Sequence, residues 1–144
     1  MSHRTLSSAR NQFAGKIAAL TKGAVNTEVV LDLDGSAGLA AIITNTSAAS
    51  LELKVGAQVL ALTKASWVIL STDTSLKTSA RNQLKGKVKT VKRGAVNAEV
   101  VLDGPGGIEI VSIITNDSLD RLALKEGQEV LALIKASHVI IGVR

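Results

Sequence analysis

Cysteine and tyrosine are both absent from the sequence, and Phe13 and Trp67 are the only phenylalanine and tryptophan. Without thiols the chain cannot form disulfides, bind metals through thiolates or use a thiol nucleophile. Any core must instead be built from valine, isoleucine, leucine and alanine. Apolar residues make up 46% of the 144 residues, so a core of this kind is within reach.

Long apolar runs are also missing. No stretch approaches the roughly 18 apolar residues of a membrane-spanning helix, and the N-terminus lacks the apolar run of a signal peptide. We therefore expect a soluble, cytoplasmic protein with no membrane partner. Residues 1–7 are expected to form a loose leader, too short to hold a helix-turn-helix for reading DNA.

The sequence contains none of the common catalytic motifs. It has no phosphate-binding loop, no paired histidine ligands and no nucleophile elbow. We therefore predict a protein that is not an enzyme and uses no organic cofactor. The net charge of +5 and the isoelectric point of about 9.8 favour anionic partners: nucleic acid, acidic surfaces or small oxyanions.

The dominant feature of the sequence is an internal repeat. A shift of 71 positions aligns residues 8–73 with residues 79–144 without a gap and gives 35 identities in 66 positions. The word SARNQ occurs at 8–12 and 79–83, GAVN at 23–26 and 94–97, and KAS at 64–66 and 135–137. We predict two tandem domains, 8–73 and 79–144, joined by a short linker, 74–78.

Within each repeat the pattern is mostly that of β-strands. In the first repeat we expect strands over 16–23, 24–33 and 38–44, and then one long strand or two broken strands over 59–70. A short helix with capping residues Thr46 and Ser47 is expected before Gly56. Three strands, a helix and two strands predict an all-β fold of two OB-like five-stranded Greek-key barrels.

Several hydrogen-bond donors recur together in both repeats. If residues 8–10 are extended, Ser8 and Arg10 point to one face, and the same reasoning applies to Lys64 and Ser66. Thr44 and Ser47 bracket the expected N-terminus of the helix, where backbone N–H groups favour an anion. With few acidic residues nearby, this set of donors suits a small tetrahedral dianion.

Each of these residues also has a structural interpretation. Residues 8–11 suit a surface strand entry, Lys64 and Lys135 suit solvated strand ends, and Ser47 and Ser118 suit helix caps. Their joint recurrence at one offset favours a binding site, although a recent duplication also explains part of it.

The GAVN segments favour a hairpin turn, since glycine and asparagine are typical turn residues. The alternative is a second kind of oxyanion site, in which backbone amides meet symmetry mates around a threefold axis. Its residues would be Gly23, Ala24, Val25 and Asn26, with Gly94, Ala95, Val96 and Asn97.

Lys85, Lys87 and Lys89 alternate along an expected strand, which favours a solvated face. A single-stranded nucleic-acid site is the alternative for an OB-like fold. Such sites stack bases on aromatic side chains, and the second repeat has no phenylalanine, tyrosine or tryptophan. We therefore expect no nucleic-acid partner. His138 stands where the first repeat has Trp67, which indicates a packing position.

Taken together, SARN, GAVN, the IT-x-x-S step and the KAS-x-V strand resemble the molybdate/tungstate-binding Mop domain, and the tandem arrangement resembles the two-domain molbindins. The resemblance implies an OB-like fold and non-catalytic binding of molybdate or tungstate for storage, buffering or delivery. It also implies sites between subunits of a homo-oligomer, a trimer with six Mop units. The alternative is a molybdate-sensing effector module that acts through a partner.

The resemblance assigns an oxyanion site to each repeat, with the lysine segment supplied by a neighbouring unit. Asp117, in place of Thr46, would weaken the second site. KASWV and KASHV stand where many members of the family have KAPWV, which frees a serine to donate. The residues assigned are Ser8, Ala9, Arg10, Thr44, Ser47, Lys64, Ala65 and Ser66, and then Ser79, Ala80, Arg81, Thr115, Ser118, Lys135, Ala136 and Ser137.

Overall fold

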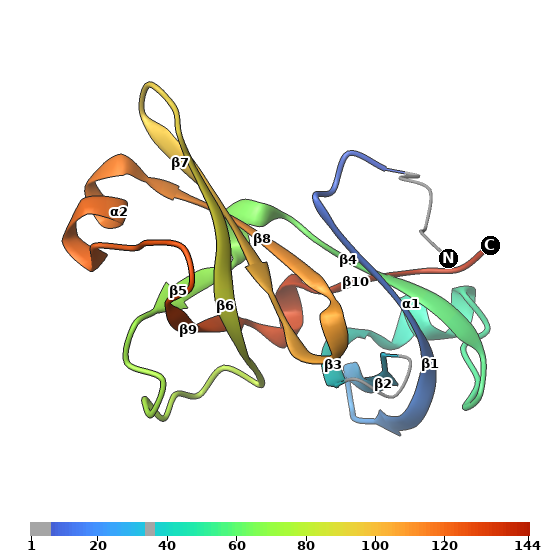
Figure 1. Cartoon of the computed structure of the whole chain (residues 1–144). Helices are drawn as coiled ribbons and strands as arrows, with labels where there is room; N and C mark the ends of the chain where they lie inside the picture. The colour runs from blue at the N-terminus through green and yellow to red at the C-terminus, as the bar shows by residue number, and fades with distance from the viewer. Residues whose placement is uncertain (1–6, 34–36) are drawn as a thin grey trace.

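The protein consists of two five-stranded antiparallel sheets with few, short helices, shown in a computed structural model that describes residues 7–33 and 37–144 (Figure 1). The expected loose leader, 1–7, lies outside the described residues except for Ser7, whose hydroxyl donates to Gln12 at 3.2 Å. Among the described residues, no helix has the length and apolar character needed to cross a membrane.

Each repeat contains three strands, a short helix and two strands, in the predicted order. The first repeat contains β1 (Asn11–Lys22), β2 (Asn26–Asp32), β3 (Gly38–Thr44), α1 (Asn45–Ser50), β4 (Gln58–Thr63), the 3-10 turn η1 (Ala65–Trp67) and β5 (Ile69–Ser71). The second contains β6 (Asn82–Arg93), β7 (Asn97–Asp103), the 3-10 turn η2 (Pro105–Gly107), β8 (Glu109–Thr115), α2 (Asn116–Leu122), β9 (Glu129–Ile134), the 3-10 turn η3 (Ala136–His138) and β10 (Ile140–Gly142).

Two local expectations need correction, and one open alternative is decided. The first strand begins at Asn11 rather than at residue 16, because NQFAG alternates buried and half-buried side chains and pairs with β4. The helix is capped by Thr44, whose hydroxyl accepts from the Ser47 backbone N–H, so Thr46 is not the cap. Residues 59–70 form two strands, which confirms the second of the two predicted alternatives, because η1 interrupts them.

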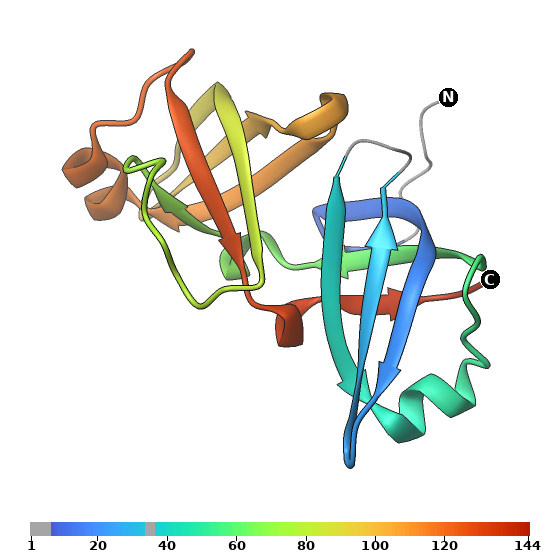
Figure 2. The same cartoon turned by 90° about the horizontal axis from the view of Figure 1, so that it is seen from below.

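The last strands of the two repeats are exchanged. The sheet orders are β10-β4-β1-β2-β3 and β5-β9-β6-β7-β8. Ile141 pairs with Ala61 of the first repeat, and Leu70 pairs with Ala132 of the second. In Figure 2, the red strand β10 lies beside the green strand β4. Each sheet therefore contains four strands of one repeat and the final strand of the other.

The core is aliphatic, as the composition predicts. β2 and β7 show strict alternation, with Val29, Leu31, Val100 and Leu102 fully buried on one face. Phe13 is the one buried phenylalanine, at 5% exposure. Buried residues of both repeats belong to one contiguous cluster, so the two sheets share a hydrophobic core.

The asparagine of each SARNQ word joins the repeats. Asn82 Nδ2 donates to the Ala40 carbonyl at 2.8 Å, and the Ala40 N–H donates to Asn82 Oδ1 at 2.7 Å. Asn11 makes the same pair of bonds with Val111. Both asparagines are buried, so this letter of the repeated word is structural.

Candidate functional site

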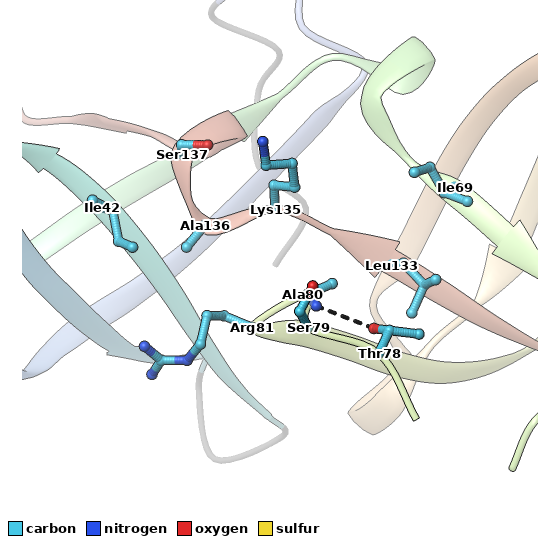
Figure 3. A pocket seen from close by; sticks show the side chains of 10 residues that line it. All are labelled: Ile42, Ile69, Thr78, Ser79, Ala80, Arg81, Leu133, Lys135, Ala136 and Ser137. Atoms are coloured by element: carbon cyan, nitrogen blue, oxygen red, sulfur yellow. Dashed lines mark hydrogen bonds between the residues drawn. The ribbon is translucent and has the colours of Figure 1, made fainter. Parts of the chain in front are cut away.

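Six residues of the second predicted site line a single cavity of about 370 Å³. Ser79, Ala80 and Arg81 come from the segment before β6, and the facing wall is the KAS segment, Lys135, Ala136 and Ser137 (Figure 3). The first repeat contributes Ile42 on β3 and Ile69 on β5, and the remaining lining residues are Thr78 and Leu133. The sequence therefore predicts most of the polar residues that line the cavity, but not the apolar ones.

The strand exchange positions the lysine segment. Lys135 follows β9, which lies in one sheet, and η3 then leads to β10, which lies in the other. The His138 N–H donates to the Lys135 carbonyl at 2.9 Å and closes this turn. The KAS segment is thus the crossing point between sheets, and Lys64–Ser66 is the equivalent crossing in the first repeat.

The alternation argument for these segments is wrong. Residues 8–10 and 79–81 are bends or irregular backbone just before a strand. Ser66 and Ser137 lie inside 3-10 turns, one residue after an alanine that is buried. The residues still meet, but through bends: the Ala80 N–H donates to the Thr78 hydroxyl at 3.1 Å, as the Ala9 N–H does to Ser7 at 3.2 Å.

Within this chain the arginine and lysine segments of one repeat lie at the same cavity, and the supply of a lysine segment by a neighbouring unit stays a prediction. Both polar segments of the cavity belong to the second repeat, and the first repeat contributes the apolar Ile42 and Ile69.

Lys64 and Lys135 have different surroundings. Lys64 Nζ lies 5.5 Å from the centre of the Trp67 ring, a cation–π distance. His138 replaces this tryptophan in the second repeat, and its ring centre lies 5.0 Å from that of Trp67. Trp67 and His138 occupy equivalent positions in the two repeats, and equivalent positions can touch only near the twofold axis that relates the repeats. His138 therefore packs against Trp67 between the repeats, in the packing position expected for it.

Both predicted arginines are paired with glutamates of the other repeat. Arg10 Nη1 donates to Glu99 Oε2 at 2.7 Å. Arg81 donates to both carboxylate oxygens of Glu28, with Nη2 at 3.2 Å from Oε1. These hydrogen bonds from arginine hold the pKa of Glu28 and of Glu99 below its usual value.

The sequence argument had placed few acidic residues near the arginines, and the two glutamates correct it. It overlooked them because they lie distant from the arginines in the sequence. A signal was available nonetheless, since both occupy the same place in the repeated GAVN-x-EV segment.

The predicted helix-start residues do not line the cavity described above. Thr44 and Ser47 instead bond each other, with 2.9 Å between their hydroxyl oxygens, and Thr115 and Ser118 do the same at 3.0 Å. Asp117 accepts from Arg121 Nε at 3.1 Å. The participation of these residues in a site therefore stays a prediction.

The GAVN segments form the hairpin turns between β1 and β2 and between β6 and β7, which confirms the structural interpretation. The Gly23 N–H donates to the Asn26 carbonyl at 2.8 Å, and the Asn45 side chain donates to the Gly23 carbonyl at 3.0 Å. Val25 and Val96 are each 71% exposed at the tips. A second oxyanion site at these tips stays a prediction.

The alternating lysines of β6 are exposed, as predicted. Lys89 pairs with Glu109 at 2.7 Å. Lys85 and Lys87 line a second cavity together with Asp103 and Glu129, so carboxylates accompany this lysine row along the strand.

Comparison with protein families gives a match to the TOBE domain over residues 7–70 and again over residues 78–141. Among solved structures, the cytoplasmic molybdate-binding protein ModG in a molybdate-bound form is 50% identical, with a TM-score of 0.92. The alignment covers 97% of this chain and 100% of that one.

Among curated proteins, the molybdenum transport protein ModE of Azotobacter vinelandii is 46% identical over 136 residues, 94% of this chain and 50% of ModE. The molybdenum-pterin-binding protein MopA of Rhodobacter capsulatus is 41% identical over 134 residues, 92% of this chain and 51% of MopA. This chain therefore spans about half the length of these curated relatives. Molybdenum-pterin-binding protein 3 of Clostridium pasteurianum is 57% identical over 63 residues, 44% of this chain and 93% of that protein.

Proposed function

Because the chain belongs to the TOBE-domain family, with two copies of the domain in tandem, we propose that it binds molybdate, and tungstate with it, without chemical change. The proposed role is storage, buffering or delivery of the oxyanion in the cytoplasm. The observation that carries the proposal is the cavity in which Ser79–Arg81 faces Lys135–Ser137. The likeness to a molybdate-bound ModG structure over the whole chain supports it.

The cavity offers the groups that a tetrahedral dianion requires. Ser79 and Ser137 supply hydroxyl donors, Lys135 supplies an ammonium, and Arg81 adds a guanidinium from a residue that also lines the cavity. Hydrogen bonds from charged donors to an oxyanion are short and about twice as strong as neutral ones. Ser8, Arg10, Lys64 and Ser66 form the equivalent set of the first repeat. We assign these groups to binding and none to a reaction.

A cavity of about 370 Å³ is larger than one tetrahedral oxyanion. We propose that a second subunit completes each site, in a trimer with six domains. Exposed apolar side chains at the hairpin tips and on the exchanged strands support an assembly: Val25, Val96, Ile69 and Ile140 are 51–71% exposed. Ligand bound between subunits would then stabilise the assembly by mass action.

Calorimetric titration of the full chain with molybdate, tungstate, sulfate and phosphate tests this function. We expect tight binding of molybdate and tungstate only, and loss of binding when Arg10 and Arg81 are both changed to alanine while the assembly persists. Native mass spectrometry of the same samples counts subunits and bound ions together. Absence of molybdate binding to the unaltered chain would overturn the proposal.

A second candidate function is a molybdate-sensing module that acts through a partner. The match to ModE, a molybdenum transport protein, over half of its length favours this candidate. Affinity purification of the tagged chain with and without molybdate separates the two roles. A sensing module recruits a second protein only in one of the two conditions, whereas a storage protein recovers its own copies in both.

A further inference from the structure

Two reciprocal ion pairs connect the repeats at their candidate sites. Arg10 of the first repeat pairs with Glu99 of the second, and Arg81 of the second pairs with Glu28 of the first. The arginine side chains are 48% and 47% exposed, and the glutamates are 30% and 33% exposed. The pairs are thus accessible to a solute that arrives from solvent.

The sheet register places these glutamates next to the cavity wall. Glu28 on β2 is the direct cross-strand partner of Ile42 on β3, and Ile42 lines the cavity together with Arg81. Directly opposed residues of an antiparallel pair point to the same face of the sheet. The Glu28 carboxylate therefore lies on the cavity side of its sheet, and Glu99 holds the equivalent place opposite Ile113.

The Arg81 side chain is turned outward by this pairing. In Figure 3 its guanidinium extends away from the Lys135 ammonium, on the side of the cavity where Ile42 lies, while Ser79 and Ala80 remain at the cavity. Arg81 uses both terminal nitrogens to hold the two oxygens of Glu28. In this bidentate contact the two terminal nitrogens donate to a carboxylate, and an oxyanion ligand would accept from the same donors.

A dianion needs positive charge in its site, and each guanidinium is already neutralised by a carboxylate. Binding an oxyanion through the donors that hold the carboxylate replaces the carboxylate and brings two like charges close together. Both effects oppose binding. They also reduce the net positive charge of the empty site, in which Lys135 remains, and this suits a protein that must release its ligand.

We propose that Glu28 and Glu99 are internal competitors for Arg81 and Arg10, so that oxyanion uptake is an exchange in which the ligand takes each guanidinium from its glutamate. This inference rests on the proposed function and adds to it that the chain limits its own affinity. The alternative is that each glutamate positions its guanidinium for the ligand. In that case removing the carboxylate would lower the affinity for the oxyanion, whereas the competitor role predicts that it raises the affinity.

The test is calorimetric titration with molybdate of the full chain and of the double variant Glu28→Gln, Glu99→Gln. Glutamine keeps the size of the side chain and removes the charge. An exposed ion pair is worth up to a factor of about five in an equilibrium constant, so we expect affinity to rise by up to about fivefold per site with unchanged stoichiometry. An unchanged or weaker affinity would overturn the competitor role.

Glu109→Gln is the matched control. Glu109 pairs with Lys89 at 2.7 Å and begins β8, at the opposite end of that strand from Ile113. Its replacement removes one negative charge outside the candidate sites, half of the change in the double variant, and we expect unchanged molybdate affinity. An equal rise in the control would assign the effect to net charge and overturn the exchange.

A second variant keeps the inference testable if the glutamine variant does not fold. In Glu28→Asp, Glu99→Asp the charge remains but the carboxylate is one methylene further from the guanidinium. We expect a smaller rise in affinity, about twofold, and a fall would again favour positioning. If the unaltered chain binds neither molybdate nor tungstate, the proposed function itself fails, which is distinct from a failure of the competitor role.

Discussion

Asn82 of the second repeat is paired through both polar atoms of its amide with the backbone of Ala40 in the first repeat, at 2.8 and 2.7 Å. Ala40 lies on β3, which is the edge strand of its sheet. An edge strand presents unpaired N–H and C=O groups, and Asn82 satisfies one of each. Asn11 does the same for Val111 on β8, the edge strand of the other sheet.

Asn82→Ala should therefore destabilise the protein strongly. The substitution leaves the buried N–H and C=O of Ala40 unpaired, and each unsatisfied buried group costs about 1–3 kcal/mol. We expect the free energy of unfolding to fall by roughly 2–4 kcal/mol, measured by denaturant titration. Asn97→Ala is the control, since Asn97 is exposed at the start of β7. A loss below about 0.5 kcal/mol for both variants would show that the amide pair contributes little.

The strand exchange predicts which engineered cysteines will form a disulfide. Ile140 on β10 pairs with Leu62 of the first repeat. If the strands were not exchanged, Ile140 would pair with Leu133 of its own repeat. In the structure Leu133 pairs instead with Ile69, the residue of the first repeat that is equivalent to Ile140. Opposed residues in an antiparallel pair lie within the Cα separation that a disulfide spans.

We therefore expect Ile140→Cys with Leu62→Cys to oxidise within one chain, and Ile140→Cys with Leu133→Cys to remain reduced. Thiol titration and non-reducing electrophoresis report the result without background, because the natural chain has no cysteine. Efficient oxidation of the second pair alone would mean that each repeat keeps its own last strand.

The order of elements could be predicted from the sequence because local patterns decide it. The alternation of Val29 and Leu31 with more exposed residues defines a strand wherever that strand lies in space. Thr44 and Ser47 mark a helix start for reasons confined to four residues. The repeat then doubles the evidence, since both copies show the same order.

The exchange of β5 and β10 could not be predicted in this way. The segments around Ile69 and Ile140 are close copies of each other, as are their partners around Leu62 and Leu133. Each final strand therefore fits either sheet, and the choice depends on the path of η1 and η3 between the sheets. The pairing of Glu28 with Arg81 escaped prediction for the same reason, since it depends on how the repeats pack.

One difference between the repeats predicts a stabilising substitution. Asn45 Oδ1 accepts from the Thr27 hydroxyl at 2.7 Å. In the second repeat Ala98 replaces this threonine, and the equivalent oxygen, Asn116 Oδ1, is buried without a hydrogen-bond partner among the residues that the structure describes. Ala98→Thr should supply the missing donor.

We expect Ala98→Thr to raise the free energy of unfolding by about 1 kcal/mol, and Thr27→Ala to lower it by a similar amount or more. Ala98→Val is the control, because valine has the shape of threonine without the hydroxyl. If valine stabilises the protein as much as threonine does, the gain comes from packing and the hydrogen-bond explanation is wrong.

Glu28 and Glu99, which pair with arginines of the other repeat, predict that the protein is less stable in acid. A hydrogen bond from Arg81 lowers the pKa of Glu28 from its ordinary value of 4.5, and Arg10 does the same for Glu99. A depressed pKa means that the unfolded chain binds protons at a higher pH than the folded protein does. The contribution of each pair is therefore complete above about pH 4.5 and is lost as the pH falls below that value.

Thermal unfolding between pH 7 and pH 3 measures this dependence. We expect the midpoint temperature of unfolding of the natural chain to decrease once the pH is below about 4.5. We expect a smaller decrease in the variant Glu28→Gln, Glu99→Gln. Part of the dependence of the unfolding temperature on pH should persist in that variant, because hydrogen bonds from Ser75 and Arg93 also lower the pKa of Asp73 and Asp120. The same acid profile in both proteins would show that the arginine–glutamate pairs between repeats do not form in solution.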